Sequence, residues 1–227
     1  MQSIAGKWAL VTGSSRGIGR QIAIGLAQLG CNVIVHGRSA LHVRETVEKL
    51  QAYDVRTHAV IADLACADGV RVLLEYLRQS DLTVDILYNN AGIQNEWRPL
   101  FEIDAQSWHR LFQVNVFSLI ALTHALIPDM QRRGYGRIIN LSSGIQATPQ
   151  LAPYSVSKAA VDRYTRDLAA ELQGSNVLVN CLDPGWCRTN LGGPQAEHEV
   201  ETILPGALQP ALLSDFSDSA YLYRAHL

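Results

Sequence analysis

The chain has 227 residues, of which 48% are hydrophobic and 18% are charged, and its formal net charge is −2. A chain of this length fits one large or two small domains, and the hydrophobic fraction is sufficient for a substantial core. The slightly acidic balance argues against nucleic acid or an anionic membrane surface as a partner.

The spacing of the cysteines and histidines argues against a disulfide-stabilised protein and against a metal-dependent enzyme. Cys31, Cys66, Cys181 and Cys187 show no C-x-x-C spacing, and the seven histidines form no H-x-x-x-H pattern. We therefore expect free thiols, a reducing cytoplasmic location and no catalytic metal. No apolar run approaches the roughly 18 residues that span a bilayer, and the N-terminus lacks the pattern of a signal peptide.

A strand, a glycine-rich turn and a helix open the chain. Residues 8–11 form a short apolar run, the turn follows at Thr12, and residues 17–29 carry apolar side chains at helical spacing before Gly30. A dinucleotide-binding turn requires this context, because glycines admit a pyrophosphate and the helix N-terminus offers unpaired N–H groups. The residues expected to bind the phosphates are Gly13, Ser15, Arg16, Gly17, Ile18 and Gly19.

Strand-like and helical segments then alternate to the C-terminus. Further strands are predicted at 32–36, 57–62, 84–88, 136–141, 177–182 and 221–224, and helices at 40–53, 67–80, 104–132, 153–173 and 199–213. Pro128 is expected to kink or end the long helix. The alternation predicts an α/β fold: one domain over residues 1–227, with a Rossmann-type, doubly wound, seven-stranded and mostly parallel sheet covered by helices on both faces.

Tyr154 and Lys158 stand four residues apart, after a strand that ends near Ser142 and Ser143. On a helix the two side chains share one face, one turn apart. A nearby cation stabilises phenolate and lowers the pKa of a phenol from about 10, so Tyr154 becomes a usable acid or base near neutral pH. Alone, this pair is more typical of an ordinary surface helix, because the spacing arises often by chance.

Five motifs, in this order, resemble those of the classical short-chain dehydrogenase/reductases: Thr12-Gly-x-x-x-Gly17-x-Gly19, Asn89-Asn90-Ala91-Gly92, Asn115, Ser143 and Tyr154-x-x-x-Lys158. The resemblance extends from about residue 5 to the C-terminus. It implies an oxidoreductase that transfers a hydride between a nicotinamide cofactor and a ketone, aldehyde or alcohol.

The resemblance implies four catalytic residues. Ser143 would hydrogen-bond the carbonyl oxygen and Tyr154 would exchange the proton. Lys158 would lower the pKa of Tyr154 and hold the nicotinamide ribose, while Asn115 would support a water relay. Ser142 competes with Ser143, but the count from the start of the strand favours Ser143. Ser143 precedes Tyr154 by eleven residues, about two fewer than is usual in the family, which affects the shape of the substrate pocket.

The same resemblance assigns cofactor contacts beyond the glycine turn. Asn90 and Gly92 would flank the adenosine ribose, and Asp63 would hydrogen-bond the adenine, although Asp63 equally suits a helix cap. The motif after the sixth strand adds Pro184, Gly185 and Thr189, of which the threonine contacts the nicotinamide end.

The residues after the second strand indicate which nicotinamide cofactor binds. NAD binders of this architecture place an acid roughly 20 residues after the glycine turn. Gly37 stands at that position, Arg38 follows, and Arg16 lies in the turn itself. Two guanidiniums without a carboxylate fit a 2′-phosphate, so we expect NADP(H) rather than NAD(H), unless these arginines are solvated surface charges.

Other functions fit the sequence less well. Residues 13–17 match the G-x-S-x-G pattern of hydrolases, but no strands precede them, and residues 155–158 match S-x-x-K without its companion motifs. A sugar-nucleotide epimerase would have a longer C-terminal half. A non-catalytic NADP(H)-binding sensor is the main alternative, although a sensor is expected to lose one of the four catalytic residues.

Assembly and substrate are expected from the resemblance alone. Helices 104–132 and 153–173 would pair with a second copy, which gives a homodimer or homotetramer. The partner is a small carbonyl or alcohol substrate: a 3-oxoacyl thioester, a sugar acid, a simple ketone and an aldehyde all remain open. Only about ten residues separate Thr189 from the next helical pattern, so we expect an open, size-tolerant site, unless a partner subunit or the C-terminal tail covers it.

Overall fold

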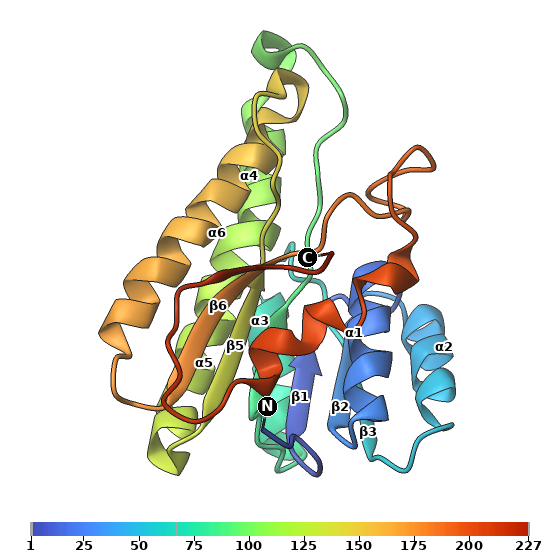
Figure 1. Ribbon diagram of the computed structural model, residues 1–227. Helices are drawn as coiled ribbons and strands as arrows, with labels where there is room; N and C mark the ends of the chain where they lie inside the picture. Colours follow the sequence, from blue (N-terminus) through green and yellow to red (C-terminus); the bar gives the residue numbers. More distant parts are fainter. Residues whose placement is uncertain (1, 67, 227) are drawn as a thin grey trace.

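The computed structural model describes residues 2–66 and 68–226, and its centre is a seven-stranded sheet (Figure 1). The strand order is β3-β2-β1-β4-β5-β6-β7, and every neighbouring pair is parallel. The strands are β1 Trp8–Val11, β2 Asn32–Gly37, β3 Thr57–Ile61, β4 Ile86–Asn89, β5 Gly136–Leu141, β6 Val177–Asp183 and β7 Leu222–Arg224. The predicted Rossmann-type fold is confirmed, with a sheet that is parallel throughout.

Helices cover both faces of the sheet (Figure 1). They are α1 Gly17–Gln28, α2 Ala40–Leu50, α3 Gly69–Gln79, α4 Ala105–Phe112, α5 Ser118–Arg133 and α6 Ala152–Glu171. One core cluster joins the sheet to α1 and α2, and a second joins it to α3, α5 and α6. Alternate residues of β1 show the division, since Ala9 and Val11 belong to the first cluster and Trp8 and Leu10 to the second. A strand buried on both faces needs apolar residues throughout, which explains the unbroken apolar runs of the sequence.

The long predicted helix 104–132 is divided, but not at Pro128. A π-helical segment, Gln113–Phe117, separates α4 from α5, and α5 continues past Pro128 to end at Gly134 with φ 66°. The expectation that Pro128 ends the helix is therefore wrong. Residues 105–133 together are long and apolar enough to cross a membrane by length and composition. In the structure Leu122 and Met130 of α5 are instead buried against the sheet, as in the core helices of α/β proteins.

The predicted helix 199–213 is also wrong. The structure has two short 3₁₀ helices there, Val200–Ile203 and Gly206–Leu212. Pro205 and Pro210 explain the difference, because each lacks the N–H group that a continuous α-helix would use. This segment packs on the α1 side of the sheet, where Ile203 and Leu208 join the core.

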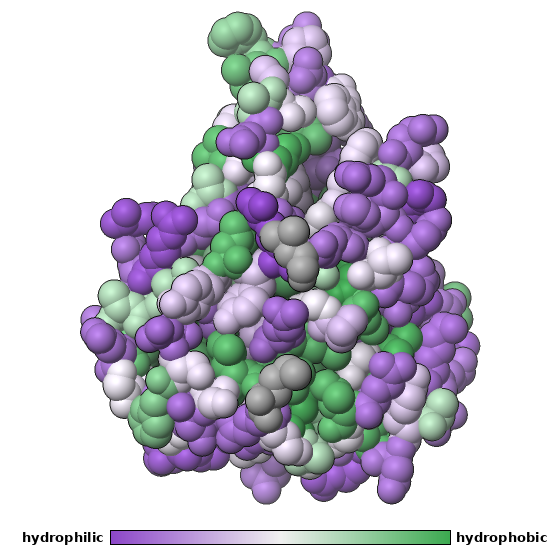
Figure 2. Space-filling view, in the orientation of Figure 1, coloured by the Kyte–Doolittle hydropathy of each residue, from purple (hydrophilic) through white to green (hydrophobic). Residues whose placement is uncertain are grey.

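The topology places a crevice at one edge of the sheet. From β1 the chain proceeds outward to β3, then returns so that β4 pairs with the other side of β1. The loops after β1 and β4 consequently diverge at the carboxyl edge, and open α/β sheets bind ligands in such a crevice. The connections after β5 and β6 end at the same edge, below the tip of the molecule formed by the chain around η1, Leu100–Glu102 (Figure 1). That tip exposes Trp97 and Phe101, and Figure 2 shows hydrophobic residues there beside hydrophilic ones.

Candidate active site

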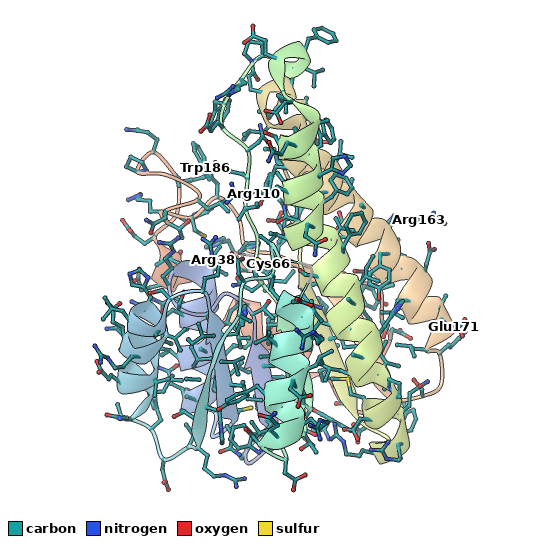
Figure 3. All side chains as sticks on the ribbon, turned by 180° about the vertical axis from the view of Figure 1, so that it is seen from behind. Arg38, Cys66, Arg110, Arg163, Glu171 and Trp186 are labelled. Atoms are coloured by element: carbon teal, nitrogen blue, oxygen red, sulfur yellow. The ribbon has the colours of Figure 1, made fainter. Side chains whose placement is uncertain are left out.

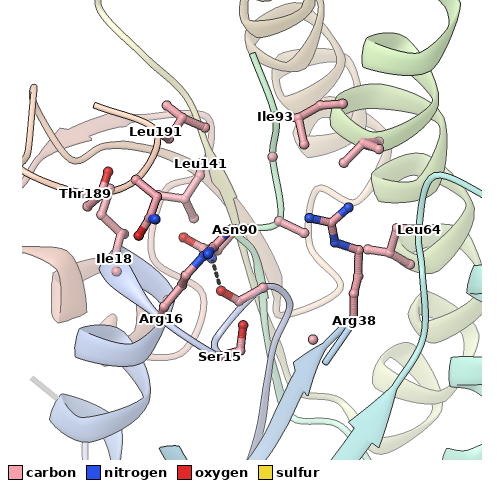
Figure 4. A pocket seen from close by; sticks show the side chains of 18 of the residues that line it. Ser15, Arg16, Ile18, Arg38, Leu64, Asn90, Ile93, Leu141, Thr189 and Leu191 are labelled. Carbon is pink, nitrogen blue, oxygen red and sulfur yellow. Dashed lines mark hydrogen bonds between the residues drawn. The ribbon is translucent and has the colours of Figure 1, made fainter. Parts of the chain in front are cut away.

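A cavity of about 680 Å³ opens at this edge, between the loops that follow β1, β2 and β4 (Figure 4). It brings together most of the predicted cofactor-binding residues: Gly13, Ser15, Arg16, Gly17, Ile18, Gly19, Arg38, Asp63, Asn90, Gly92, Tyr154, Lys158, Pro184 and Thr189. Gly185, Asn115 and Ser143 are not part of this lining. Gly185 borders a second cavity, whereas Asn115 and Ser143 contact residues at the wall of the first.

Asn90 holds the glycine turn from behind. Its side-chain amide donates to the carbonyl oxygens of Thr12 at 2.8 Å and Gly13 at 3.2 Å, and its backbone N–H donates to the Thr12 hydroxyl at 3.0 Å. The third glycine is required by this contact, because a β-carbon at Gly19 would lie 2.4 Å from the Asn90 amide nitrogen. Asn90 therefore shapes the turn, in addition to bordering the cavity as expected.

The first helix directs its N-terminus into the cavity. α1 begins at Gly17, and Arg16 occupies its N-cap position with no side-chain capping bond. The first N–H groups of a helix have no partner within the helix, and with the positive end of the helix dipole they favour an anion. The arrangement thus suits the pyrophosphate of a dinucleotide.

His36 was missed by the sequence analysis and fixes the same turn. Its Nδ1 accepts a hydrogen bond from the Gly13 N–H at 3.1 Å, so Nε2 carries the proton and donates to the Ala62 carbonyl at 3.2 Å. Burial lowers the pKa of His36 to about 4, and the ring is neutral at physiological pH. The sequence feature that could have indicated this role is a histidine at the end of an otherwise apolar strand.

Arg38 and Arg16 border the cavity from opposite loops (Figure 4). Arg38 follows β2, and among the described residues no carboxylate lies within ion-pair distance of either guanidinium. Asp63, at the end of β3, accepts a hydrogen bond from the Ala65 N–H at 3.0 Å. That bond lies in a turn and caps no helix, since α3 begins at Gly69 with Asp68 at its N-cap, so the helix-cap alternative for Asp63 is wrong. Asp63 instead lines the cavity.

Lys158 lies beneath Tyr154 on α6. Its ammonium donates to the Leu141 carbonyl oxygen at 2.7 Å and lies 5.7 Å from the centre of the Tyr154 ring. The side chain is buried, and the loss of hydration lowers the pKa of Lys158 to about 8, against the smaller opposing influences of Cys181, Asp162 and Asp183. The two side chains share one helix face, as the spacing predicted.

The pKa of Tyr154 is raised, whereas the sequence predicted that it is lowered. Burial is the largest cause, a hydrogen bond with the Ser143 side chain opposes it, and the negative charge of Asp183 adds to the increase. Without a bound cofactor, the desolvation of the phenol therefore outweighs stabilisation of the phenolate. At neutral pH Tyr154 is a proton donor.

The two adjacent serines have different partners. Ser142 is buried, and its hydroxyl donates to the Asp162 carboxylate. Ser143 forms the hydrogen bond with Tyr154 and accepts another from the Ile145 N–H at 3.3 Å. Ser142 lines the main cavity but is engaged by Asp162, whereas Ser143 is the serine of this pair that influences the Tyr154 phenol, so the choice of Ser143 stays a prediction.

Asn115 occupies the π-helical segment between α4 and α5. Its Oδ1 accepts from the Ile93 N–H at 2.9 Å, and its Nδ2 donates to the Ile93 carbonyl at 2.9 Å and to the Ser157 hydroxyl at 3.0 Å. A β-carbon at Gly92 would lie 3.5 Å from Asn115 Oδ1 and 3.7 Å from Lys158 Nζ. Asn115 therefore fixes the loop beside the lysine. Its amide groups are engaged by protein atoms, and π-helical segments are frequent at functional sites.

The segment after β6 closes the cavity on the nicotinamide side expected from the resemblance. Pro184, Thr189 and Leu191 line the cavity, and the Thr189 hydroxyl accepts a hydrogen bond from the Gly192 N–H at 3.0 Å. Trp186 lies on this loop (Figure 3) and donates through its indole N–H to the Gly192 carbonyl at 2.8 Å. No helix occurs in this described part of the chain between Thr189 and the 3₁₀ helix Val200–Ile203, as the short sequence there predicted.

Comparison with known proteins gives one consistent result. The family model described as short chain dehydrogenase matches residues 7–200. A short-chain type dehydrogenase/reductase of Picea abies is 35% identical over 198 residues, which cover 83% of this chain and 73% of that protein. A gluconate 5-dehydrogenase from Burkholderia cenocepacia J2315, solved with NADP and tartrate, matches with a TM-score of 0.84 and 28% identity, over 97% of this chain and 93% of that one. The L-sorbose reductase from Gluconobacter frateurii, complexed with NADPH and L-sorbose, matches with a TM-score of 0.87 and 28% identity. The match covers 98% of this chain and 95% of that one.

Proposed function

This chain is a dehydrogenase/reductase that belongs to the short-chain dehydrogenase/reductase family, and we propose that it uses NADP(H) to interconvert a ketone or aldehyde and an alcohol. The observation that carries the proposal is the grouping of Ser143, Tyr154 and Lys158: the Ser143 side chain hydrogen-bonds Tyr154, and the buried Lys158 ammonium lies 5.7 Å from the centre of the Tyr154 ring. These three groups can bind a carbonyl oxygen, give it a proton and stabilise the charge left behind.

The main cavity fits a nicotinamide dinucleotide. The α1 N-terminus offers unpaired N–H groups for the pyrophosphate, and the glycine turn leaves room for it. Asp63 would lie on the adenine side, Lys158 near the nicotinamide ribose and Thr189 at the nicotinamide end. When bound, the cofactor supplies or accepts the hydride.

Tyr154 exchanges the proton at the substrate oxygen. In carbonyl reduction its phenol donates a proton as negative charge develops on that oxygen, while the Ser143 hydroxyl donates a hydrogen bond to the same atom. The Lys158 cation then stabilises the phenolate. The raised pKa of Tyr154 is consistent with a protonated phenol that donates in the direction of reduction.

NADP(H) is proposed over NAD(H) because of the charges around the end of β2. Arg38 and Arg16 border the cavity without an ion-pair partner among the described residues, and Gly37 offers no carboxylate. A 2′-phosphate would supply the anion that the two guanidiniums lack. Solved relatives bound to NADP or NADPH support this choice.

Tyr154→Phe tests the activity. An NADPH-oxidation screen, with NADH alongside, should cover 3-oxoacyl thioesters, keto sugar acids, simple ketones and aldehydes. For a substrate found in that screen, the variant should lose about 10²–10⁴-fold in kcat, because proton transfer by a positioned acid contributes that much. The Kd for NADPH should stay within a few-fold of wild type. A variant that keeps more than a tenth of the wild-type kcat would remove Tyr154 from proton transfer.

A non-catalytic NADP(H) sensor is the second candidate. The fold alone would serve both functions, but a sensor has no use for a serine hydroxyl bonded to a tyrosine above a buried lysine. NADPH binding in a fluorescence titration, with no turnover across all four substrate classes, would favour the sensor.

We further propose a cytoplasmic homo-oligomer that acts on a small molecule. Cys31, Cys181 and Cys187 are buried free thiols whose pKa values are raised by burial, which suits a reducing compartment. Phe117 and Val156 are exposed apolar side chains on the helices expected to pair with a second copy.

A further inference from the structure

A second cavity, of about 310 Å³, lies where the loops after β5 and β6 meet the C-terminal segment. Gly144 directly follows Ser143, and Gly185 directly follows Pro184, which lines the main cavity. The two cavities therefore share the loops after β5 and β6. Most of the second lining consists of Gly144, Asp183, Gly185, His198, Arg224 and His226.

Asp183 is the acidic residue among the described residues of this lining. Its Oδ1 accepts a hydrogen bond from the Gly185 N–H at 3.0 Å, and its Oδ2 lies 3.0 Å from the point that a β-carbon on Gly144 would occupy. No donor from the described residues contacts Oδ2. Asp183 is the last residue of β6, directly before Pro184 of the main cavity, and lies beside Gly144, which directly follows Ser143.

The remaining lining is polar, and much of it comes from the C-terminal segment. Arg224 of β7 stands in register with Asp183 of β6. The rings of His198 and His226 stack with their centres 3.8 Å apart, and His226 Nε2 lies 3.0 Å from the Pro184 carbonyl oxygen. Gly185 permits this packing, since a β-carbon there would lie 2.8 Å from His226. The C-terminal segment thus lines the second cavity, whereas the lining of the main cavity contains none of its described residues.

This chemistry disfavours an alkyl substituent on the substrate. An ionised carboxylate only accepts hydrogen bonds, and covering it with an apolar group removes its water without replacing it. A substrate hydroxyl restores the lost bond, and bonds to a charged partner are stronger than neutral ones.

We propose that Asp183 is a specificity-determining residue that selects polyhydroxylated ketones or aldehydes, with a substrate hydroxyl donating to its free Oδ2. The inference rests on the proposed carbonyl-reducing function and narrows its substrate class. Arg224 and the paired imidazoles supply the polar wall against which further hydroxyls lie.

The test compares two ketones of equal chain length, 1,3,4-trihydroxybutan-2-one and butan-2-one, with NADPH. Wild type should show the higher kcat/KM for the triol. Asp183→Ala should lower the triol-to-butanone ratio of kcat/KM by about 10–100-fold, which corresponds to one hydrogen bond to a charged group. Asp183→Asn should lower it less, because the amide oxygen still accepts. Both ketones need the same proton from Tyr154, so any effect of Asp183 on that pKa cancels in the ratio.

Asp167→Asn is the matched control, because it removes a carboxylate from the exposed face of α6, where Asp167 pairs with Arg163. Its ratio should equal that of wild type. The thermal shift caused by the triol in NADPH-saturated protein is a second readout that needs no turnover, and Asp183→Ala should abolish it.

An unchanged ratio in Asp183→Ala, or a wild-type preference for butan-2-one, would overturn the proposal. If neither ketone is reduced while the triol-dependent shift is still lost in Asp183→Ala, the subsite stands and the proposed activity fails. Loss of the NADPH-induced shift in Asp183→Ala would show a folding defect, and the Asp183→Asn ratio then decides between the outcomes.

Discussion

At the scale of single residues, Lys158 couples activity to pH. Its pKa of about 8 lies below the ordinary value of 10.5, because burial penalises the cation. Carbonyl reduction needs the cation to stabilise the Tyr154 phenolate, so kcat/KM for reduction should fall as the pH rises through about 8. A pH profile with saturating NADPH measures this, and a profile that stays flat to about pH 9.5 would contradict it. The effect on stability has the opposite direction: between pH 8 and 10.5 the unfolded chain binds more protons, so this group adds stability as the pH rises.

Arg38 should decide cofactor preference. Arg38→Ala removes a guanidinium from the wall of the cavity, and one charge-assisted hydrogen bond is worth about 1.5–3 kcal/mol. The Kd for NADPH should rise by roughly 10–100-fold while that for NADH changes little. Fluorescence titration of both cofactors checks the selectivity, with Arg44→Ala as a control on the exposed face of α2. Equal losses for the two cofactors would reject the assignment.

At the scale of elements, β2 and the glycine turn are joined by His36. The pKa of the buried ring is about 4 in the folded chain, against an ordinary value of 6.5, so the folded form binds fewer protons between these two values. The contribution of His36 to stability is fully present above pH 6.5 and is lost as the pH falls toward 4. The loss amounts to about 3 kcal/mol at most, since one pKa unit corresponds to about 1.36 kcal/mol.

His36→Gln should therefore have a lower free energy of unfolding at pH 7, because it disturbs the hydrogen bond from the Gly13 N–H. Its free energy of unfolding should also change less between neutral and acidic pH than that of the wild type. Urea unfolding of both proteins at pH 7 and about pH 4.5 gives the comparison. The wild type should lose more unfolding free energy between these pH values than the variant does. Parallel losses would show that another group controls the acid sensitivity.

At the scale of the whole molecule, the α4–α5 pair and α6 run side by side as a long exposed unit (Figure 3). Phe117 is 52% exposed and Val156 46% exposed on this unit. Exposed apolar side chains such as Phe117 and Val156 fit an interface in which these helices pack against the same helices of a second copy. We expect wild type to sediment as a dimer or tetramer at micromolar concentration, and Phe117→Glu to shift it toward monomer.

Leu41→Glu provides the control for that substitution. Leu41 is 54% exposed on α2, away from this unit, so the same change there should leave the oligomer intact. A wild-type protein that sediments only as a monomer would refute the pairing.

The sequence by itself determined the fold class, the family and the order of the site motifs. Local patterns carry that information: apolar runs for strands buried on both faces, a glycine turn between a strand and a helix, and the four-residue spacing of Tyr154 and Lys158. The choice of Ser143 over Ser142 also comes from the sequence, since it depends on distance along one strand, and it stays a prediction.

Only the tertiary structure decided how the site is charged and supported. The pKa of Tyr154 is raised because burial depends on segments distant in sequence, and the tail residue His226 reaches His198 only once β7 pairs with β6. The division of the long helix at Asn115, and not at Pro128, was likewise invisible, because the Asn115 side chain binds the loop at Ile93. Hydration and long-range contacts set these properties, and neither is encoded by the spacing of residues within one element.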